Sequence, residues 1–261
     1  AARKGNSKNQ RPLYDIMFDH HLESIRLSPR KTSFTFDKKK FEMPLLGLFN
    51  AYNAAGAIST ALTLGVEMNQ IKKAIRDATP VPCRMELVDK GQDFTVIVDY
   101  AHEPASLEAV YRTVKNLRLG SRATKKNSKM ICLLGGQGGG RDKWKRGAMG
   151  KIAGEHCNTI ILTNEDPYDE NPNQILADIQ LGIQNSKFQI RLSDNTDPNF
   201  YKFLERKDAM KKAFSLAKKD DVVLFTGKGG EIWMCVKDNK KIPWDEKGVA
   251  EELLTEMQMR R

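Results

Sequence analysis

The sequence predicts an α/β fold with a mostly parallel sheet, flanking helices and a C-terminal antiparallel hairpin. Two observations lead to this prediction. From Arg84 onward, short apolar runs alternate with segments whose apolar residues have helical spacing, which is the pattern of parallel strands joined by helices. Polar or glycine-rich segments follow the apolar runs, at the positions where open α/β sheets bind their ligands.

The first eighty residues are predicted to form a separate segment in front of this sheet. Ser33–Asp37 and Lys40–Leu45 are predicted as two short strands around a lysine-rich turn. An alanine-rich helix ending at Leu64 follows, and Val66–Ala78 again has helical spacing before Thr79-Pro80-Val81-Pro82 interrupts it. We therefore expect two domains, residues 1–80 and 81–261. The first is expected to pack poorly without the partner strands of a larger sheet.

The remaining elements are justified by strand-like apolar runs and by amphipathic segments between them. Strands are predicted at Phe94–Asp99, Met130–Leu134, Thr159–Thr163, Phe188–Leu192 and Val222–Thr226. The helices between them are predicted at Pro104–Leu117, Trp144–His156, Pro172–Gln184 and Asn199–Lys218. Ile232–Val236 and Lys241–Trp244 then form a hairpin pattern, and a last helix begins at Lys247.

Composition excludes several classes of partner. The formal charge is +10, but the lysine runs are interleaved with acidic residues, so we expect solvated surfaces and no nucleic-acid partner. The four cysteines are dispersed and show no C-x-x-C spacing. Neither a zinc site nor a disulfide is therefore expected, and Cys132 is predicted to be a small buried apolar residue. The sequence shows no signal peptide and no apolar run of membrane-spanning length. A cytoplasmic protein without a membrane partner is expected.

Two pairs of polar positions are candidates for nucleotide contacts. Asp99-Tyr100-Ala101-His102 ends one predicted strand. Asp99 can accept hydrogen bonds from ribose hydroxyls or hold a cation, and His102 can orient a phosphate; the alternative is a capping aspartate and a surface histidine. Asn50 and Asn53 are three residues apart at a predicted helix start, where amides can contact a purine edge. Ordinary helix capping is the alternative there.

Glycine-rich loops follow two further strands. Gly135–Gly140 precedes four cationic residues within Arg141–Arg146, and free backbone N–H groups beside cations suit anionic oxygens. We therefore predict an anionic, phosphorylated ligand. The loop matches neither a P-loop nor the dinucleotide fingerprint. Gly227-Lys228-Gly229-Gly230-Glu231 combines an ammonium with a carboxylate, which suits a zwitterion such as an amino acid; a flexible turn is the alternative. Asn164–Tyr168 ends a strand in the same way.

These loops, in this order and spacing, resemble the Mur ligase family, and within it the ligases that add the third peptide residue to UDP-N-acetylmuramoyl-L-alanyl-D-glutamate. The resemblance covers about Met43 to Val249. Its motifs are Gly47–Asn53, Arg84-Met85-Glu86, Val98–His102, Gly138–Arg146, Asp166-Pro167 and Asp221–Gly229. It implies a Rossmann-like sheet for residues 81–261, as the C-terminal domain of such a ligase. Residues 1–80 would be the incomplete end of the central ATPase domain.

The resemblance also implies a role for each matched residue. Asn50 and Asn53 correspond to adenine contacts, Arg84 to a phosphate contact and Asp99 to a ribose contact. Arg141 corresponds to the arginine that binds the carboxylate of the incoming amino acid. The complete nucleotide set is Asn50, Asn53, Arg84, Asp99, Tyr100 and His102, and the amino-acid set is Arg141, Asp166, Tyr168, Gly227, Lys228 and Glu231. No catalytic residue and no metal ligand is assigned, and the Mg²⁺ ligands are expected outside this chain.

Two departures from the family pattern concern the amino acid. Where ligases for meso-diaminopimelate carry Asp-Asn-Pro-Arg, this chain has Glu165-Asp166-Pro167-Tyr168, and the family's Gly-Lys-Gly-His-Glu lacks its histidine here. Tyr168 cannot supply the positive fork that binds a distal carboxylate. We therefore expect L-lysine or a similar residue to be added, unless Arg146 or Arg191 compensates.

The family reaction forms an acyl phosphate from ATP and the carboxylate of the UDP-N-acetylmuramoyl dipeptide, and the amino acid's amine then attacks it. No P-loop occurs in the chain, so we expect it to be inactive alone, as a truncated ligase or beside a second chain that carries the UDP-binding and ATPase domains. Two alternatives stay open. One is a non-catalytic module that binds an amino acid or a nucleotide; the other is a ligase of the folylpolyglutamate or cyanophycin synthetase type.

Overall fold

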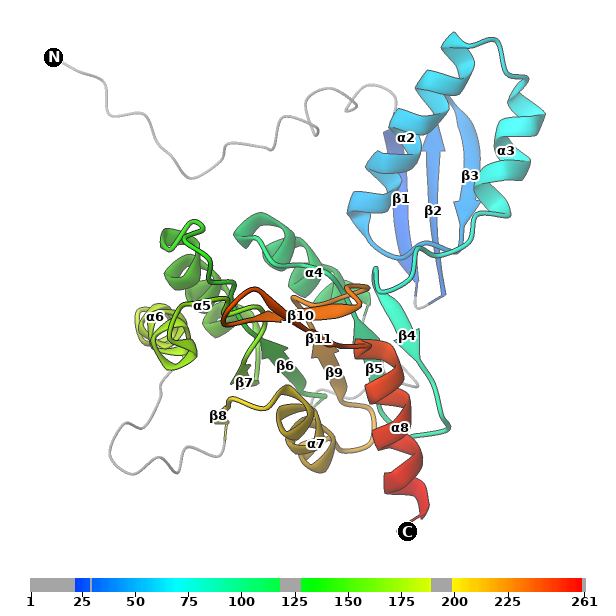
Figure 1. The fold of residues 1–261 in the computed structure, drawn as a ribbon. Helices are drawn as coiled ribbons and strands as arrows, with labels where there is room; N and C mark the ends of the chain where they lie inside the picture. Colours follow the sequence, from blue (N-terminus) through cyan, green and yellow to red (C-terminus); the bar gives the residue numbers. More distant parts are fainter. Residues whose placement is uncertain (1–21, 29, 118–127, 189–198, 260–261) are drawn as a thin grey trace, which may run out of the picture. The chain divides into compact units, whose positions relative to one another are not determined.

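The computed structural model describes residues 22–28, 30–117, 128–188 and 199–259. The chain divides into two compact units, Ala1–Pro80 and Val81–Arg261 (Figure 1). Each unit is described by itself below.

The first unit is a three-stranded antiparallel sheet with two helices. Its strands, in spatial order, are β1 (Leu22–Ser28), β2 (Lys31–Phe36) and β3 (Lys39–Met43), followed by α2 (Leu48–Thr63) and α3 (Met68–Arg76). Side chains alternate across the strands, so Phe34, Phe36 and Phe41 are buried together against Ala55 and Ile58 of α2. The described residues therefore build a core of their own, which corrects the expectation of poor packing. Strand β1 was not predicted.

The second unit is built on a six-stranded sheet. Its strands are β4 (Glu86–Val88), β5 (Thr95–Val98), β6 (Met130–Leu134), β7 (Thr159–Thr163), β8 (Phe200–Phe203) and β9 (Val222–Phe225). The spatial order is β4-β5-β9-β6-β7-β8, and every pairing is parallel except that of the edge strand β4 with β5. The predicted mostly parallel sheet is confirmed. Four of the parallel strands are fully buried along most of their length, as expected for a sheet covered on both faces.

Helices cover both faces of this sheet (Figure 1). The helices are α4 (Pro104–Leu117), α5 (Trp144–His156), α6 (Pro172–Gln184), α7 (Arg206–Leu216) and α8 (Glu246–Met259). Helices α4, α5 and α6 pack side by side on one face. Buried residues of α7 and α8, such as Phe214 and Leu254, share one core with Val98 and Phe225 on the other. The hairpin β10 (Trp233–Val236) and β11 (Lys240–Pro243) confirms the predicted C-terminal pair.

One predicted element is displaced. Helix α7 begins at Arg206, and Phe200–Phe203 pairs with β7 as strand β8, although we predicted a helix from Asn199. The aromatic side chains of Tyr201 and Phe203 pack against the core beside α7, and this tertiary contact outweighs the helical propensity of the lysine-rich run. The predicted strand Phe188–Leu192 lies almost wholly outside the described residues.

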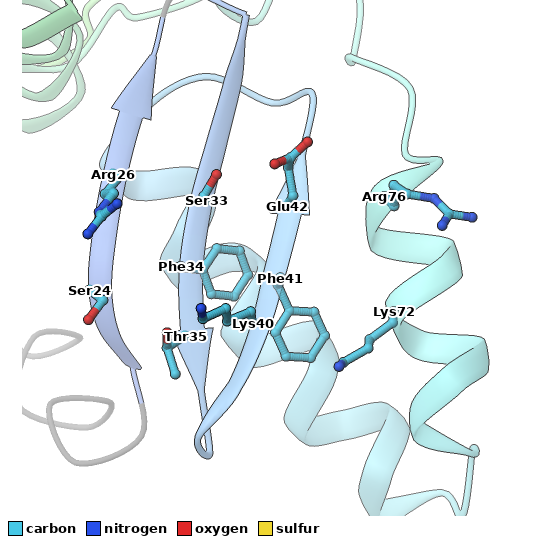
Figure 2. A pocket seen from close by; sticks show the side chains of 10 residues that line it. All are labelled: Ser24, Arg26, Ser33, Phe34, Thr35, Lys40, Phe41, Glu42, Lys72 and Arg76. Atoms are coloured by element: carbon cyan, nitrogen blue, oxygen red, sulfur yellow. The ribbon is translucent and has the colours of Figure 1, made fainter.

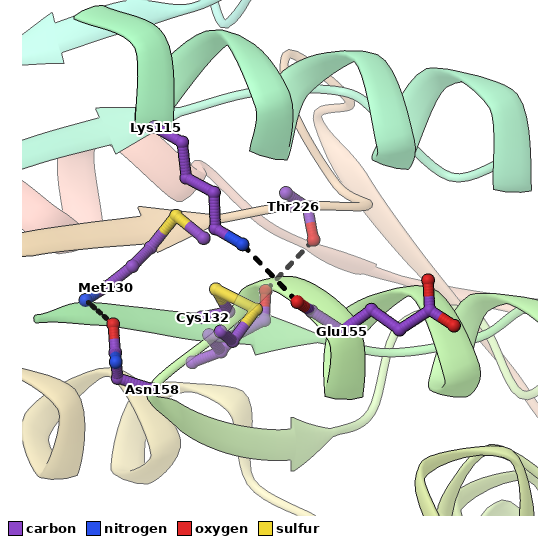
Figure 3. Close-up of a disulfide and its surroundings, with 8 residues drawn as sticks. Lys115, Met130, Cys132, Glu155, Asn158 and Thr226 are labelled. Carbon is purple, nitrogen blue, oxygen red and sulfur yellow. Dashed lines mark hydrogen bonds between the residues drawn. A yellow bond between two sulfur atoms is a disulfide. The ribbon is translucent and has the colours of Figure 1, made fainter. Parts of the chain in front are cut away.

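A disulfide corrects the prediction from the cysteine spacing. Cys132 in β6 is bonded to Cys157, which directly follows α5, and their Cα atoms are 6.1 Å apart (Figure 3). The crossover from β6 through α5 to β7 returns the chain beside β6, where Asn158 also accepts a hydrogen bond from the Met130 N–H at 2.8 Å. The crossover brings the two cysteines together in space, although they are 25 residues apart in the sequence. The spacing of the cysteines could therefore not predict the bond.

Candidate ligand site at the switch point of the sheet

Four loops converge where the direction of the strand connections reverses. Strand β9 lies between β5 and β6, although it is the last strand of the sheet in sequence. In open α/β sheets this switch point is where ligands bind, at the carboxyl ends of the strands. Backbone hydrogen bonds tie neighbouring strand ends together. The Asp99 N–H donates to the Phe225 carbonyl at 2.9 Å, and the Gly138 N–H donates to the Asp166 carbonyl at 2.8 Å.

Asp99 anchors a loop from the edge of the sheet. Its Oδ2 accepts from the Met85 N–H at 2.7 Å, and its Oδ1 accepts from the Ala101 N–H at 2.7 Å. Burial, with only 4% of the residue exposed, raises its pKa above the ordinary value against the opposing effect of these hydrogen bonds. Both carboxylate oxygens are therefore engaged by backbone, and Asp99 holds the loop that carries Arg84.

That loop presents Arg84 to solvent. Its neighbours Cys83 and Met85 have φ of 54° and 50°, and the Glu86 carboxylate fixes it by accepting from the Cys83 N–H at 2.7 Å. The Arg84 guanidinium stacks on the Tyr100 ring, 4.5 Å from its centroid. Within the described part of the chain it makes no hydrogen bond, so its donors point to solvent and suit an anionic oxygen.

Tyr100 bridges the loops after β5 and β9. Its hydroxyl donates to Glu231 Oε1 at 2.6 Å, and its ring lies 4.6 Å from that of His102. The His102 Nδ1 is 2.8 Å from the Tyr100 carbonyl oxygen. Burial and the neighbouring Glu231 carboxylate raise the pKa of Tyr100 to about 12, so the phenol remains a neutral donor at physiological pH.

Lys228 lies inside the protein rather than at its surface. Its side chain is 0% exposed, and its Nζ donates to Asp166 Oδ1 at 2.9 Å and to Glu231 Oε2 at 2.6 Å. Asp166 Oδ1 also accepts from the Cys235 N–H at 2.8 Å. Burial alone would raise the pKa of Glu231, but the bonds from Lys228 and Tyr100 hold it below its ordinary value. Glu231, 32% exposed, is the member of this cluster that reaches solvent.

Glu165 was not among the predicted site residues. It directly follows Asn164 at the end of β7 and is 1% exposed, and within the described residues neither carboxyl oxygen has a hydrogen-bond partner. Burial raises its pKa to about 7, against the lowering effect of Arg206. Gly227, with φ of 102°, packs over this carboxyl group, and a Cβ there would overlap it. A carboxylate next to Asp166 at a strand end was the signal that could have found it.

Arg141 and Tyr168 lie at the glycine loop after β6. Arg141 is exposed and follows Gly139 and Gly140, whose φ values are 72° and 74°. The Tyr168 ring covers Gly139, where a Cβ would lie 3.0 Å from it. A hydrogen bond to the Cys235 side chain is the main cause that raises the pKa of Tyr168, and nearby Arg141 opposes the shift. The tyrosine therefore occupies the space beside the arginine.

Two of the other three cations of this segment are buried and have structural partners. Arg146 is 1% exposed and donates to Asp178 at 3.0 Å and to Glu170 at 2.9 Å. Lys145, 3% exposed, donates to Glu103 at 2.6 Å. Both cations are engaged by carboxylates, so Arg146 is not free to compensate for the missing arginine. Arg191 lies outside the described residues.

Sequence analysis also missed the pair that supports two of the loops. Arg206 and Glu246 are both fully buried, and Arg206 Nη2 is 2.6 Å from Glu246 Oε1. The same guanidinium donates to the carbonyls of Asn164 at 3.1 Å and Thr226 at 2.7 Å. The pair thereby joins the ends of β7 and β9, and forty residues of separation hid it from sequence inspection.

The predicted adenine contacts belong to the first unit. Asn50 donates from Nδ2 to the Leu46 carbonyl at 2.8 Å, and Asn53 donates to Asn50 Oδ1 at 3.2 Å. The two amides therefore share one face at the start of α2. Across the described ranges, no group of His, Cys, Asp or Glu side chains could hold a metal ion. In the same ranges, no helix is both long enough and apolar enough to span a membrane.

These loops lie within a stretch of the chain that matches the model of a known protein family. The family model for the glutamate ligase domain of Mur ligases matches residues 83–229. A UDP-N-acetylmuramoyl-L-alanyl-D-glutamate–2,6-diaminopimelate ligase from Fusobacterium nucleatum is 37% identical over 221 residues, covering 85% of this chain and 41% of the relative. The enzyme of the same name from Clostridium tetani is 36% identical over 245 residues, covering 92% and 46%. The chain thus spans less than half the length of these relatives.

Solved structures share the fold at lower sequence identity. A ligase structure with the same diaminopimelate name has a TM-score of 0.57 at 23% identity, covering 91% of this chain and 45% of its own. A MurF ligase from Thermotoga maritima in complex with ADP has a TM-score of 0.57 at 15% identity, covering 92% and 47%. These structures support the fold, and the family model extends over more than half of the sequence. The chain belongs to the Mur ligase family.

Proposed function

We propose that this chain is part of an ATP-dependent amide ligase that adds the third amino acid to UDP-N-acetylmuramoyl-L-alanyl-D-glutamate. The named function of the relatives supports this proposal, as do loops at a switch point that combine outward cations with buried carboxylates. In this assignment residues 1–80 correspond to the end of the central ATPase domain, and residues 81–261 to the C-terminal domain. A longer polypeptide or a second chain would supply the UDP-binding part and the rest of the ATPase part.

The chemistry assigns separate tasks to the loops. The dipeptide carboxylate attacks the terminal phosphate of ATP, which gives an acyl phosphate and ADP. The amine of the amino acid then attacks the acyl carbon and releases phosphate. Arg84 would bind phosphate oxygens and Arg141 the amino acid's carboxylate, while Glu231 would accept hydrogen bonds from an ammonium group. The loops act by positioning and charge neutralisation. Mg²⁺ would neutralise phosphate charge.

One observation carries the amino-acid part of the proposal. The Lys228 ammonium is shared by the two carboxylates of Asp166 and Glu231, and the positive charge of nearby Arg206 is already matched by Glu246. Negative charge therefore exceeds positive charge, and a ligand's ammonium group beside Glu231 would reduce the imbalance. An amino acid with a second amine suits this site.

We further propose L-lysine, or a residue with a similar side chain, in preference to meso-diaminopimelate. A distal carboxylate needs a cation, and Tyr168 occupies the position beside Arg141 where the resemblance places an arginine. Arg146 is engaged with Asp178 and Glu170. The relatives are named for 2,6-diaminopimelate, so the two amino acids must be compared directly.

Calorimetric titration of the full chain with each amino acid, with and without a non-hydrolysable ATP analogue, tests both parts. We expect L-lysine to bind at least about tenfold more tightly, because an unpaired buried carboxylate costs on the order of 1–3 kcal/mol. Arg141→Ala and Glu231→Gln should abolish measurable binding, whereas Arg112→Ala, at an exposed arginine on α4, should not. Tighter binding of meso-diaminopimelate would refute the lysine proposal alone. Binding of neither amino acid would refute the amino-acid site.

A further inference from the structure

A cavity lies in the first unit, on the polar face of its sheet. Its volume is about 530 Å³, within the range of small-molecule sites. The residues alternate along β1, β2 and β3, so the face opposite the aromatic core carries hydroxyl and charged side chains (Figure 2). Ser33 lies between Arg26 and Glu42 in the strand register, and Thr35 pairs with Lys40. Polar side chains of three neighbouring strands therefore line the cavity side by side.

The charges around this cavity are not balanced. Arg26, Lys40 and Lys72 contribute cations from β1, β3 and α3, and none of the three forms an ion pair within the described ranges. Glu42, the acidic residue of the lining, is already paired with Lys31 at 2.7 Å. The Lys72 ammonium extends from α3 over the Phe41 ring, 5.8 Å from its centroid (Figure 2). Arg76, the fourth cation of the lining, is paired with Asp77 at 3.0 Å. Three of the four positive charges around the cavity are therefore not compensated by an ion pair.

The neutral part of the lining adds hydrogen-bond donors. Ser24, Ser33 and Thr35 carry hydroxyl groups along the polar face, and Phe34 and Phe41 stack at 5.4 Å beneath the cavity. Both rings are 5% exposed or less, so neither offers a surface on which a nucleobase could stack. Hydroxyls and cations on a rigid apolar support favour a compact ligand with several anionic oxygens.

We propose that this cavity binds a small phosphorylated anion through Arg26, Lys40 and Lys72. None of the residues assigned to the nucleotide or to the amino acid lines this cavity, and all of its lining residues belong to the first unit. The cations meet at a cavity from three elements and do not form an extended stripe. This arrangement favours a compact anion over a nucleic acid or a membrane surface, for which a continuous basic face is typical.

The test is a titration of the full, isotope-labelled chain with inorganic pyrophosphate, followed by NMR. We expect the amide signals of β2, β3 and α3 to shift together. Because each amide is observed separately, this site is distinguished from phosphate contacts at Arg84 or Arg141. The triple variant Arg26→Gln, Lys40→Gln, Lys72→Gln should bind at least about tenfold more weakly.

The matched control is the triple variant Lys38→Gln, Lys39→Gln, Lys73→Gln, which removes three exposed cations from the same unit outside the cavity. It should bind within about twofold of the unsubstituted chain. An unshifted amide spectrum away from the binding site verifies the fold of both variants. Equal weakening in the two variants, or shifts confined to residues 81–261, would overturn the proposal. So would displacement of pyrophosphate from these strands by an oligonucleotide or by anionic vesicles with higher affinity.

Discussion

Single residues at the strand ends carry the properties of the candidate site. Gly227 and Glu165 form one such contact, because the glycine's left-handed backbone brings its Cα directly over a buried carboxyl group. Tyr100 and Glu231 form another, although they are 131 positions apart in the sequence. Neither contact is visible in the sequence, since glycine-rich and acidic loops also occur as ordinary turns.

Gly227→Ala is expected to destabilise the second unit by about 2–5 kcal/mol, since the new Cβ meets both an unfavourable φ and the Glu165 carboxyl group. Urea unfolding measures the change. Gly230→Ala is the control, because its Cβ would lie 3.7 Å from the nearest atom, at ordinary contact distance. Similar midpoints for the two variants would contradict the packing described here.

The pH dependence of stability should report Glu165. Its pKa is about 7 in the folded chain, and a carboxyl group in the unfolded chain ionises near its ordinary value of about 4.3. The folded state therefore holds the proton between these values, and the free energy of unfolding falls as pH rises through this window. The loss amounts to about 4 kcal/mol and levels off above pH 7. Between pH 5 and pH 8, the urea midpoint should fall more steeply with pH for the unsubstituted chain than for Glu165→Gln. An equal pH dependence in both chains would show that Glu165 is not its cause.

At the scale of elements, apolar runs predicted most strands and helices of the second unit to within a residue or two. Helices α4, α5 and α6 begin and end where their amphipathic patterns do. The pattern failed at β8, where aromatic residues pack on the core although lysines follow them. It failed again at β1, whose alternation is irregular because the register shifts between Glu23 and Arg26. Local propensity predicts neither the core packing of β8 nor the irregular pairing of β1, because both depend on tertiary contacts.

Helix α7 is linked to α8 and to two strand ends by the Arg206–Glu246 pair. Arg206→Ala should therefore destabilise the chain by about 3–5 kcal/mol, because it leaves the Glu246 carboxylate buried without its partner. Lys207→Ala is the control in the next position. It breaks an exposed pair with Glu252 at 3.0 Å, which is worth about 1 kcal/mol or less. Chemical denaturation measures the stability of both variants. Equal losses of stability would show that the buried pair contributes no more than the exposed one.

At the scale of the whole molecule, the chain has two units, each with its own core. The sequence predicted the interruption at Thr79–Pro82 from its prolines, but it could not predict the core of the first unit. That core depends on how three short strands pair, and pairing over such distances has no local signature. The same limit applies to the candidate site: the loops were predicted, but their mutual contacts were not.

Limited proteolysis should cut between the units. Thr79, Pro80 and Val81 are exposed and lie outside helices and strands, so a protease of broad specificity is expected to cleave there and to leave residues 81–261 as a stable fragment. Mass spectrometry of the early products identifies the cleavage position. Early cleavage within β6, α5 or β7 would contradict a compact second unit.

The position of β9 also has a consequence for how the second unit forms during synthesis. The strand that completes the middle of the sheet is the last of the six to emerge from the ribosome. Until it emerges, β5 has no partner on the side that will face β6, and the two halves of the sheet remain separate. Joining the two halves of the sheet therefore depends on contacts between parts of the chain that are distant in sequence, and such contacts slow folding. The ligand loops acquire their arrangement only when β9 inserts between β5 and β6. A nascent chain should therefore have no ligand affinity before residue 225 has emerged from the ribosome.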